Sequence, residues 1–269
     1  MDQPARQSGF TLIEMVMVIV IMGVIGATVA VFVSKPIDAY FDTGRRAALT
    51  DIADTAVRRM ARDLGGALPN SVRNPGNQCI EFIPTRTGGR YRAEVSAGGT
   101  GDVLDFTVAD TSFNMLGNNG LLPADQQIRA GDVVAVYNLG IAGADAYAGD
   151  NTSVVSGVVS GSESTITIAP KQFPLASGTN RFHVIPGSEK IVAFVCSGGN
   201  LLRSANHAYA NSCPTSGATV SVLAGNVTSC NFAVNTDLQH SALVQLTIGF
   251  TASSETVSLY HEVHVNNTP

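Results

Sequence analysis

The sequence predicts an α+β fold, in which one long N-terminal helix packs on an antiparallel β-sheet head. Three observations lead to this class: an uncharged apolar run at residues 15–33, an amphipathic helical pattern at residues 45–64, and a period of two after Pro69. Periods of 3.6 and 2 residues distinguish helices from strands. Hydrophobic residues make up 45% of the chain, enough for a substantial core, and the net charge of −5 argues against a nucleic-acid partner.

The apolar run at residues 15–33 is long enough to cross a bilayer. Its 19 residues carry no formal charge and span roughly 28 Å at the helical rise, close to the thickness of a hydrocarbon core. A cleaved secretory signal has a shorter apolar core that ends in small residues, whereas this run continues into SKPIDAYF. The run therefore predicts a membrane-spanning helix, and on apolarity alone an ordinary signal anchor is the alternative.

Positive charges give conflicting indications of orientation. Arg6 precedes the run while Lys35, Arg45 and Arg46 follow it, so the positive-inside rule alone places the C-terminal part in the cytoplasm. The rule weakens where a long domain is translocated. An even set of cysteines without zinc-ligand spacing favours disulfides in an oxidising compartment, and hence an exported head.

The four cysteines, Cys79, Cys196, Cys213 and Cys230, predict two disulfides. We expect Cys213 to pair with Cys230, which closes a short loop, and Cys79 to pair with Cys196, which ties the early chain to a central strand. The pairings 79–213 with 196–230, and 79–230 with 196–213, stay open as alternatives.

Residues 45–64 have the pattern of an amphipathic helix. Asp and Arg occupy the face opposite to the apolar stripe, and Gly65 and Pro69 end the pattern. A helix continuous from Phe10 extends about 80 Å. Pro36 is the expected place for a kink, because proline removes a backbone donor. The apolar stripe consists of Leu49, Ile52, Ala53, Ala56, Val57, Met60, Ala61 and Leu64.

After Pro69, apolar residues alternate in short segments separated by Gly, Pro, Asn and Ser, as in an antiparallel sheet. Residues 251–255 are expected to close a hairpin between the last two strands. The predicted strands are residues 79–83, 102–108, 132–138, 164–169, 181–185, 190–196, 226–234, 242–250 and 255–265.

The stretch GFTLIE at residues 9–14, followed by the apolar run, resembles the class III signal of type IV pilins and pseudopilins. The resemblance implies that a prepilin peptidase cuts after Gly9 and that the new N-terminal residue, Phe10, is methylated. It also implies that Glu14, then the fifth mature residue, pairs during assembly with the N-terminal amine of a neighbouring subunit.

A carboxylate deep in lipid costs about 2.5–3.5 kcal/mol on insertion scales. The amine of a neighbour offsets this cost only in the assembled state, which gives Glu14 a physical role in docking. The alternative is that Glu14 lies near enough to the interface for its side chain to reach water.

Further stretches resemble the family of the mannose-sensitive haemagglutinin (MSHA) pilus biogenesis protein O, and more loosely the type IV minor pilin W and the type II secretion pseudopilin J. The resemblance implies a low-abundance subunit that helps to start or cap a pilus. It is least specific at residues 84–180. The stretches are RRMARDLGGALPNSVRNPG, GSEKIVAFVCSGGNLLRSA, VLAGNVTSCNFAV and HEVHVNNTP.

The resemblance implies a division into a leader at residues 1–9, a transmembrane half of the helix at 10–34, an amphipathic half at 35–66 and a β-rich head at 67–269. It implies a single-pass protein of the bacterial inner membrane with its head in the periplasm, which later joins the pilus. The implied partners are other minor pilins, the major pilin, the prepilin peptidase, the inner-membrane assembly platform and inner-membrane lipid.

The size of the head favours a position at the pilus tip. A compact head of roughly 200 residues has a radius of about 16–17 Å, which is large for a repeating subunit. A membrane-anchored periplasmic or surface binding module, such as an adhesin, and a type II secretion pseudopilin are the alternatives.

No motif in the sequence indicates an enzyme. G-x-S-x-G, P-loop and H-E-x-x-H patterns are missing, so we expect no catalytic site, no cofactor and no metal. His261 and His264, three apart on a predicted strand, point to opposite faces, and we expect His261 in the core. Asp145 and Asp150 offer oxygen ligands for calcium in a glycine-rich loop, but a plain surface loop is the preferred interpretation.

Overall fold

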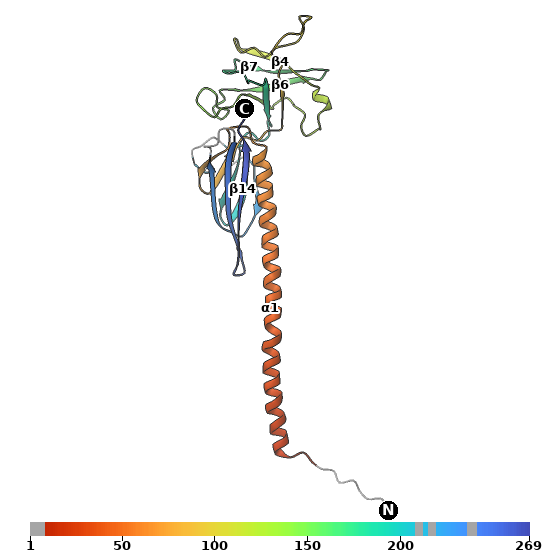
Figure 1. Ribbon diagram of the computed structural model, residues 1–269, viewed down its shortest axis with the longest axis vertical. Helices are drawn as coiled ribbons and strands as arrows, with labels where there is room; N and C mark the ends of the chain where they lie inside the picture. Colours follow the sequence, from red (N-terminus) through yellow and green to blue (C-terminus); the bar gives the residue numbers. More distant parts are fainter. Residues whose placement is uncertain (1–8, 208–211, 215–218, 236–240) are drawn as a thin grey trace, which may run out of the picture. The chain divides into compact units, whose positions relative to one another are not determined.

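A computed structural model shows an α+β protein, as predicted (Figure 1). One helix, α1 (Leu12–Gly65), precedes a series of antiparallel sheets. The chain divides into two compact units, Met1–Ala48 and Leu49–Pro269. Residues 1–8 of the expected leader lie outside the described part of the chain. The structure describes residues 9–207, 212–214, 219–235 and 241–269.

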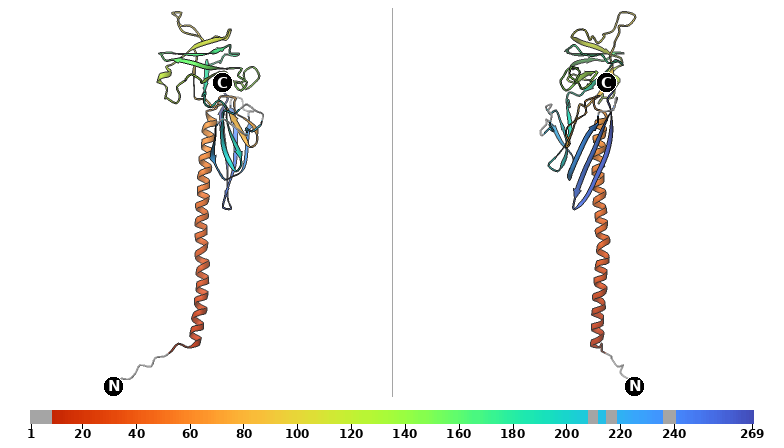
Figure 2. Two further views of the ribbon diagram at one scale, coloured as in Figure 1. Left: turned by 180° about the vertical axis from the view of Figure 1, so that it is seen from behind. Right: turned by 60° about the vertical axis from the view of Figure 1, so that its left-hand side comes forward.

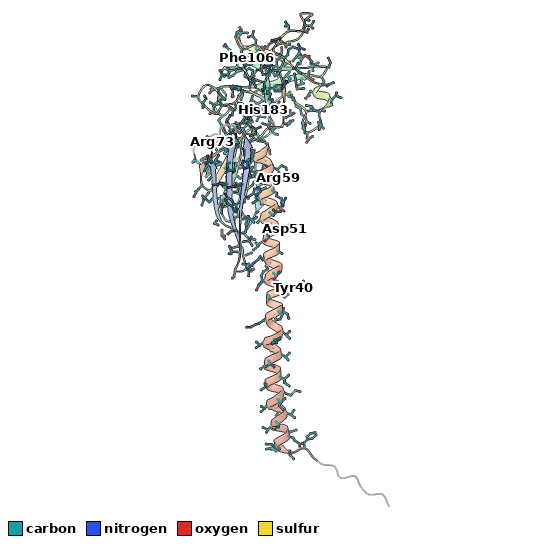
Figure 3. The ribbon with its side chains drawn as sticks, in the orientation of Figure 1. Tyr40, Asp51, Arg59, Arg73, Phe106 and His183 are labelled. Carbon is teal, nitrogen blue, oxygen red and sulfur yellow. A yellow bond between two sulfur atoms is a disulfide. The ribbon has the colours of Figure 1, made fainter. Side chains whose placement is uncertain are left out.

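Helix α1 continues through Pro36 and ends at Gly65, where the sequence predicts its end. Within the unit Leu49–Pro269, one face of the helix packs on the sheets, while Asp51 and Arg59 are exposed (Figure 3). The assignment of Ile52 to the apolar stripe was wrong, because this side chain lies at the margin of the stripe and is 42% exposed. The buried residues of the stripe are Leu49, Ala53, Ala56, Val57, Met60 and Leu64.

The helix shares one hydrophobic core with a five-stranded and a three-stranded sheet. The five-stranded sheet has the order β1-β2-β9-β10-β11, and the three-stranded sheet has the order β12-β13-β14. The first consists of β1 (Arg73–Gly76), β2 (Cys79–Phe82), β9 (Val192–Ser197), β10 (Asn200–Ala205) and β11 (Thr219–Ala224). The second consists of β12 (Val227–Asn235), β13 (Ser241–Ala252) and β14 (Glu255–Asn266).

The predicted hairpin joins β13 to β14 and is confirmed. Ala252 pairs with Glu255, so only two residues form the turn. Both of them, Ser253 and Ser254, have positive φ angles of 49° and 68°. Positive φ at both central residues is the geometry that matches the twist of the flanking strands in a two-residue hairpin.

A separate module is inserted between β2 and β9 (Figure 2). These two strands pair directly, with Phe82 opposite Val192. The chain therefore leaves the five-stranded sheet and returns to it at adjacent positions. The module contains a six-stranded antiparallel sheet with the order β3-β8-β5-β6-β7-β4. Its elements are β3 (Thr87–Arg90), β4 (Asp110–Met115), the 3₁₀ turn η1 (Asn119–Leu121), β5 (Val133–Val136), β6 (Thr152–Val159), β7 (Ser164–Lys171) and β8 (Arg181–Ile185).

The two edges of this six-stranded sheet meet, which closes it into a barrel. Tyr91 forms a bridge with Met115, the Arg92 amide donates to Asn114 O at 2.8 Å, and the Leu116 amide donates to Arg90 O at 2.8 Å. Because the chain at β3 pairs with β4, neither strand is left as an exposed sheet edge where they meet. The interior has its own core, formed by Tyr91, Leu104, Phe113, Met115, Ile128, Val134, Val136, Val155, Ile166, Ile168, Phe173, Phe182 and Val184.

Residues 102–108 were predicted to form a strand, and this prediction was wrong. Asp105 Oδ1 accepts hydrogen bonds from the Thr107 amide and from Thr107 Oγ1, both at 2.7 Å, and Asp110 Oδ2 accepts one from the Asp105 amide at 2.8 Å. Local bonds of this kind give the backbone an alternative to a sheet ladder. The strands that were not predicted are β1, β3, β4, β6, β10 and β11.

His261 was expected in the core, but it is exposed. Its position on β14 is opposite Leu246, which is fully buried on the neighbouring strand. β14 is the edge strand of the three-stranded sheet. A side chain at an edge can share the core face and still reach solvent, so alternation alone overstated its burial.

A buried ionic cluster joins the β1–β2 hairpin to a loop of the barrel. The fully buried Glu81 carboxylate accepts a hydrogen bond from Arg73 Nε at 2.6 Å and lies 2.5 Å from His207 Nε2. The Arg73 guanidinium (Figure 3) also covers the ring of Tyr147, 4.3 Å from the ring centre. Burial, aided by the charge of Glu81, raises the pKa of Tyr147 well above its usual value, so its hydroxyl remains a donor to Ser71 O.

We expect Glu81→Ala to lower the free energy of unfolding of the head by about 3–5 kcal/mol, the usual effect of removing one partner from a buried ion pair. The change leaves Arg73 and His207 without this carboxylate. Urea unfolding of the variant and the wild type measures the difference. Glu94→Ala, at an exposed position, is the control, and equal stability of the two variants would contradict the role assigned to the cluster.

Candidate functional site

The N-terminus of α1 holds Glu14 in a defined position. Thr11 immediately precedes the helix, and Glu14 is its third residue. Glu14 Oε2 accepts hydrogen bonds from the Thr11 amide and from Thr11 Oγ1, both at 2.9 Å. In return, the Glu14 amide donates to Thr11 Oγ1 at 3.3 Å. These reciprocal bonds form a capping box, which satisfies backbone donors that the first helical turn leaves free.

Thr11 was not predicted to be the partner of Glu14. The T-x-x-E spacing before an apolar run is the signature of a capping box and would have indicated it. The carboxylate also lies at the positive end of the helix dipole, which favours a negative charge. Glu14 therefore has a local partner in the single chain, before any neighbour is present.

The residues around the expected cleavage position are accessible. Gly9 and Phe10 lie before the first helical residue and are both exposed, Phe10 by 85%. A peptide bond outside regular structure and open to solvent can enter a protease site without unfolding a helix. The geometry is thus compatible with cleavage between these two residues.

The helix surface that follows is apolar. The large apolar side chains between Phe10 and Val33 are all exposed in the isolated chain. By length and composition, α1 can cross a membrane, and none of its most apolar stretch is buried. An apolar surface of this extent requires lipid or other helices around it.

All four cysteines form disulfides, but the expected pairing was wrong. The structure pairs Cys79 with Cys213 and Cys196 with Cys230, with Cα–Cα distances of 5.6 and 6.4 Å. Cys79 lies opposite Val195 on β9, and adjacent residues of a strand point to opposite faces. Cys196 therefore points away from Cys79, and its disulfide ties the five-stranded sheet to β12.

The residues considered as metal ligands are either exposed or bonded within their own loop. His261 and His264 are both exposed. Asp145 accepts a hydrogen bond from the Tyr147 amide, and Asp150 accepts one from the Gly143 amide, so both carboxylates hold their own loop together. Within the described ranges, no three His, Cys, Asp or Glu residues are grouped as metal ligands.

Residues 4–30 match the family model described as the prokaryotic N-terminal methylation motif. No curated protein and no solved structure matches the chain. The motif implies interaction with pilus assembly machinery and with other pilins, and the apolar helix fits membrane anchoring. Together, the motif, the helix and the β-sheet head support a structural subunit of the type IV pilin-like or pseudopilin-like kind.

Proposed function

We propose that this protein is a minor pilin-like subunit that initiates or caps the assembly of an MSHA-type IV pilus at its tip. The observation that carries the proposal is the methylation motif, with Glu14 fixed at the N-terminus of an exposed apolar helix. The head stretches that resemble the MSHA pilus biogenesis protein O support the choice of pilus system.

In this proposal, a prepilin peptidase cleaves between Gly9 and Phe10, and the new amine of Phe10 is methylated. The accessible peptide at this position supports the step. The Glu14 carboxylate then exchanges part of its capping box for the N-terminal amine of a neighbouring subunit. The exchange replaces neutral donors from Thr11 with a cation, and a charged donor makes the stronger hydrogen bond.

The two disulfides support a head in the periplasm, because such bonds persist in oxidising compartments. The subunit is then a single-pass protein of the inner membrane before it joins the pilus. Its partners are the major pilin, other minor pilins and the inner-membrane assembly platform.

The inserted barrel supports a position at the tip. It adds a module with its own core to a head that already contains two other sheets. Subunits along a helical filament have neighbours on all sides, whereas a terminal subunit leaves room for an enlarged head. The same barrel favours the second candidate function, a surface binding module carried by a pilin-like anchor.

Quantitative labelling of purified filaments tests the position. Antibodies to the inserted barrel should mark one end of each filament, at far lower abundance than the major subunit. Label along the whole shaft, at a stoichiometry comparable to that of the major subunit, would contradict the tip proposal.

A further inference from the structure

A cavity of about 410 Å³ lies on the outer wall of the inserted barrel. Buried Ile83, Val133 and Ile185 form its apolar base. The strand register places Val133 opposite Val154 and Ile185, so these three share the outward face. The alternating residues, such as Val134, belong to the barrel interior. The cavity therefore uses the side of the sheet that the barrel core does not occupy.

The walls of the cavity are also largely apolar. Val154, Ala169 and Pro170 line it and are exposed, and Ile191 is half-buried there. Its volume is within the range of about 300–1,000 Å³ that is usual for small-molecule sites. An apolar surface of this shape gains free energy when an apolar ligand displaces water from it.

Two lysines line this apolar cavity. The chain contains three lysines, Lys35, Lys171 and Lys190, and the two in the unit Leu49–Pro269 both lie here. The positive charge of that unit is otherwise carried by arginine, which pairs with carboxylates elsewhere, for example Arg92 with Glu163. Both lysines of that unit therefore bring their ammonium groups to the lining of one cavity.

Among the described residues, the acids near these lysines form no ion pair with them. Asp110 on β4 lies opposite Lys171 in the strand register, and its carboxylate accepts hydrogen bonds from the amides of Asp105 and Thr111. Within the described ranges, no carboxylate oxygen lies within 4.0 Å of either lysine nitrogen, and Lys171 Nζ donates to Gly149 O at 2.8 Å. Glu189, the neighbour of Lys190 in sequence, is engaged elsewhere. Arg203 donates to both of its oxygens, at 2.9 and 2.8 Å, and lowers the pKa of Glu189.

We propose that this cavity binds a small organic anion, with a carboxylate at Lys171 and Lys190 and an apolar body over Ile83, Val133 and Ile185. A lysine ammonium is a compact point charge with three donors, so it accepts a carboxylate without the planar fit that arginine requires. An inorganic anion satisfies the charges but leaves the apolar base in contact with water. The cavity lies within a single chain, so binding of the anion does not require assembly into a filament.

The test uses the full chain in nanodiscs of zwitterionic lipid, with 4-phenylbutyrate as the probe and empty nanodiscs as the blank. Calorimetric titration should show saturable binding of one molecule per chain. The neutral amide of the same acid and inorganic phosphate should each bind at least about tenfold more weakly, the effect of losing roughly 1.4 kcal/mol of interaction.

Three variants locate the site. The double change Lys171→Gln and Lys190→Gln should weaken 4-phenylbutyrate binding at least about tenfold, and Ala169→Phe, at an exposed wall position, should block the cavity. Lys35→Gln is the matched control and should bind as the wild type does. Absence of binding at millimolar probe, equal binding of the neutral amide, or insensitivity to the lysine changes would each overturn the proposal.

Discussion

Glu14→Ala is expected to reduce incorporation of the subunit into filaments about tenfold or more, the effect of losing an interaction of roughly 1.4 kcal/mol. The alanine variant lacks the carboxylate that pairs with the amine of a neighbour. Because Glu14 lies outside the unit Leu49–Pro269, the head should fold as in the wild type. Mass spectrometry of sheared filaments and of the membrane fraction measures the distribution of the subunit between them.

Two further variants separate the charge from the helix cap. Glu14→Gln keeps an acceptor for Thr11 but has no charge, so it should be as defective as Glu14→Ala. Thr11→Val removes the capping hydroxyl and keeps the carboxylate, so it should still be incorporated. Asp51→Ala, at an exposed carboxylate further along the same helix, is the matched control. Normal incorporation of Glu14→Gln would contradict an ionic pair at this position.

Removal of a disulfide is the second large effect. The chain-entropy model gives about 5 kcal/mol for the Cys79–Cys213 bond, which spans 134 residues, and about 4 kcal/mol for Cys196–Cys230, which spans 34. Replacement of both cysteines of one pair by serine should lower the free energy of unfolding, measured in urea. The loss should be larger for Cys79–Cys213 than for Cys196–Cys230. Each double variant keeps the other disulfide, so the two double variants serve as controls for each other.

Peptide mapping without reduction tests the pairing itself. Linked peptides that contain Cys79 with Cys213 and Cys196 with Cys230 are expected. Linkage of Cys213 to Cys230 would restore the pairing that the sequence suggested and contradict the register of β2 and β9. Four free thiols in protein from the cell envelope would contradict an exported head.

Much of the fold follows from local patterns in the sequence. The stripe from Leu49 to Leu64 predicts the packed face of α1, since helical spacing is fixed by the backbone. Strict alternation predicts β13 and β14, because each strand has one buried face. The turn at Ser253 and Ser254 follows from the short distance between these two strands along the chain.

Features that depend on contacts between distant segments could not be predicted in this way. The barrel closes through pairing of Tyr91 with Met115, which no local period indicates. The disulfide partners depend on the register of Cys79 opposite Val195. β11 has mostly exposed residues on both faces and therefore lacks the alternation that would have marked it as a strand.

At the candidate site, the sequence indicates the chemistry of the N-terminus more clearly than that of the head. Gly9, Phe10 and Glu14 fall within one short motif, and their proposed roles come from the resemblance of that motif to the prepilin signal. Lys171, at the end of β7, and Lys190, just before β9, are 19 positions apart in the sequence, and only the folded chain brings them to one cavity. A binding site assembled in this way has no sequence signature.

The mass of the mature N-terminus tests the central claim most directly. Protein purified from the envelope and digested should yield an N-terminal peptide that begins at Phe10 and carries one methyl group on its amine. Gly9→Val is the matching variant and should retain the leader. A mature protein that still begins at Met1, from cells with an active prepilin peptidase, would contradict the assignment of this chain as a pilin-like subunit.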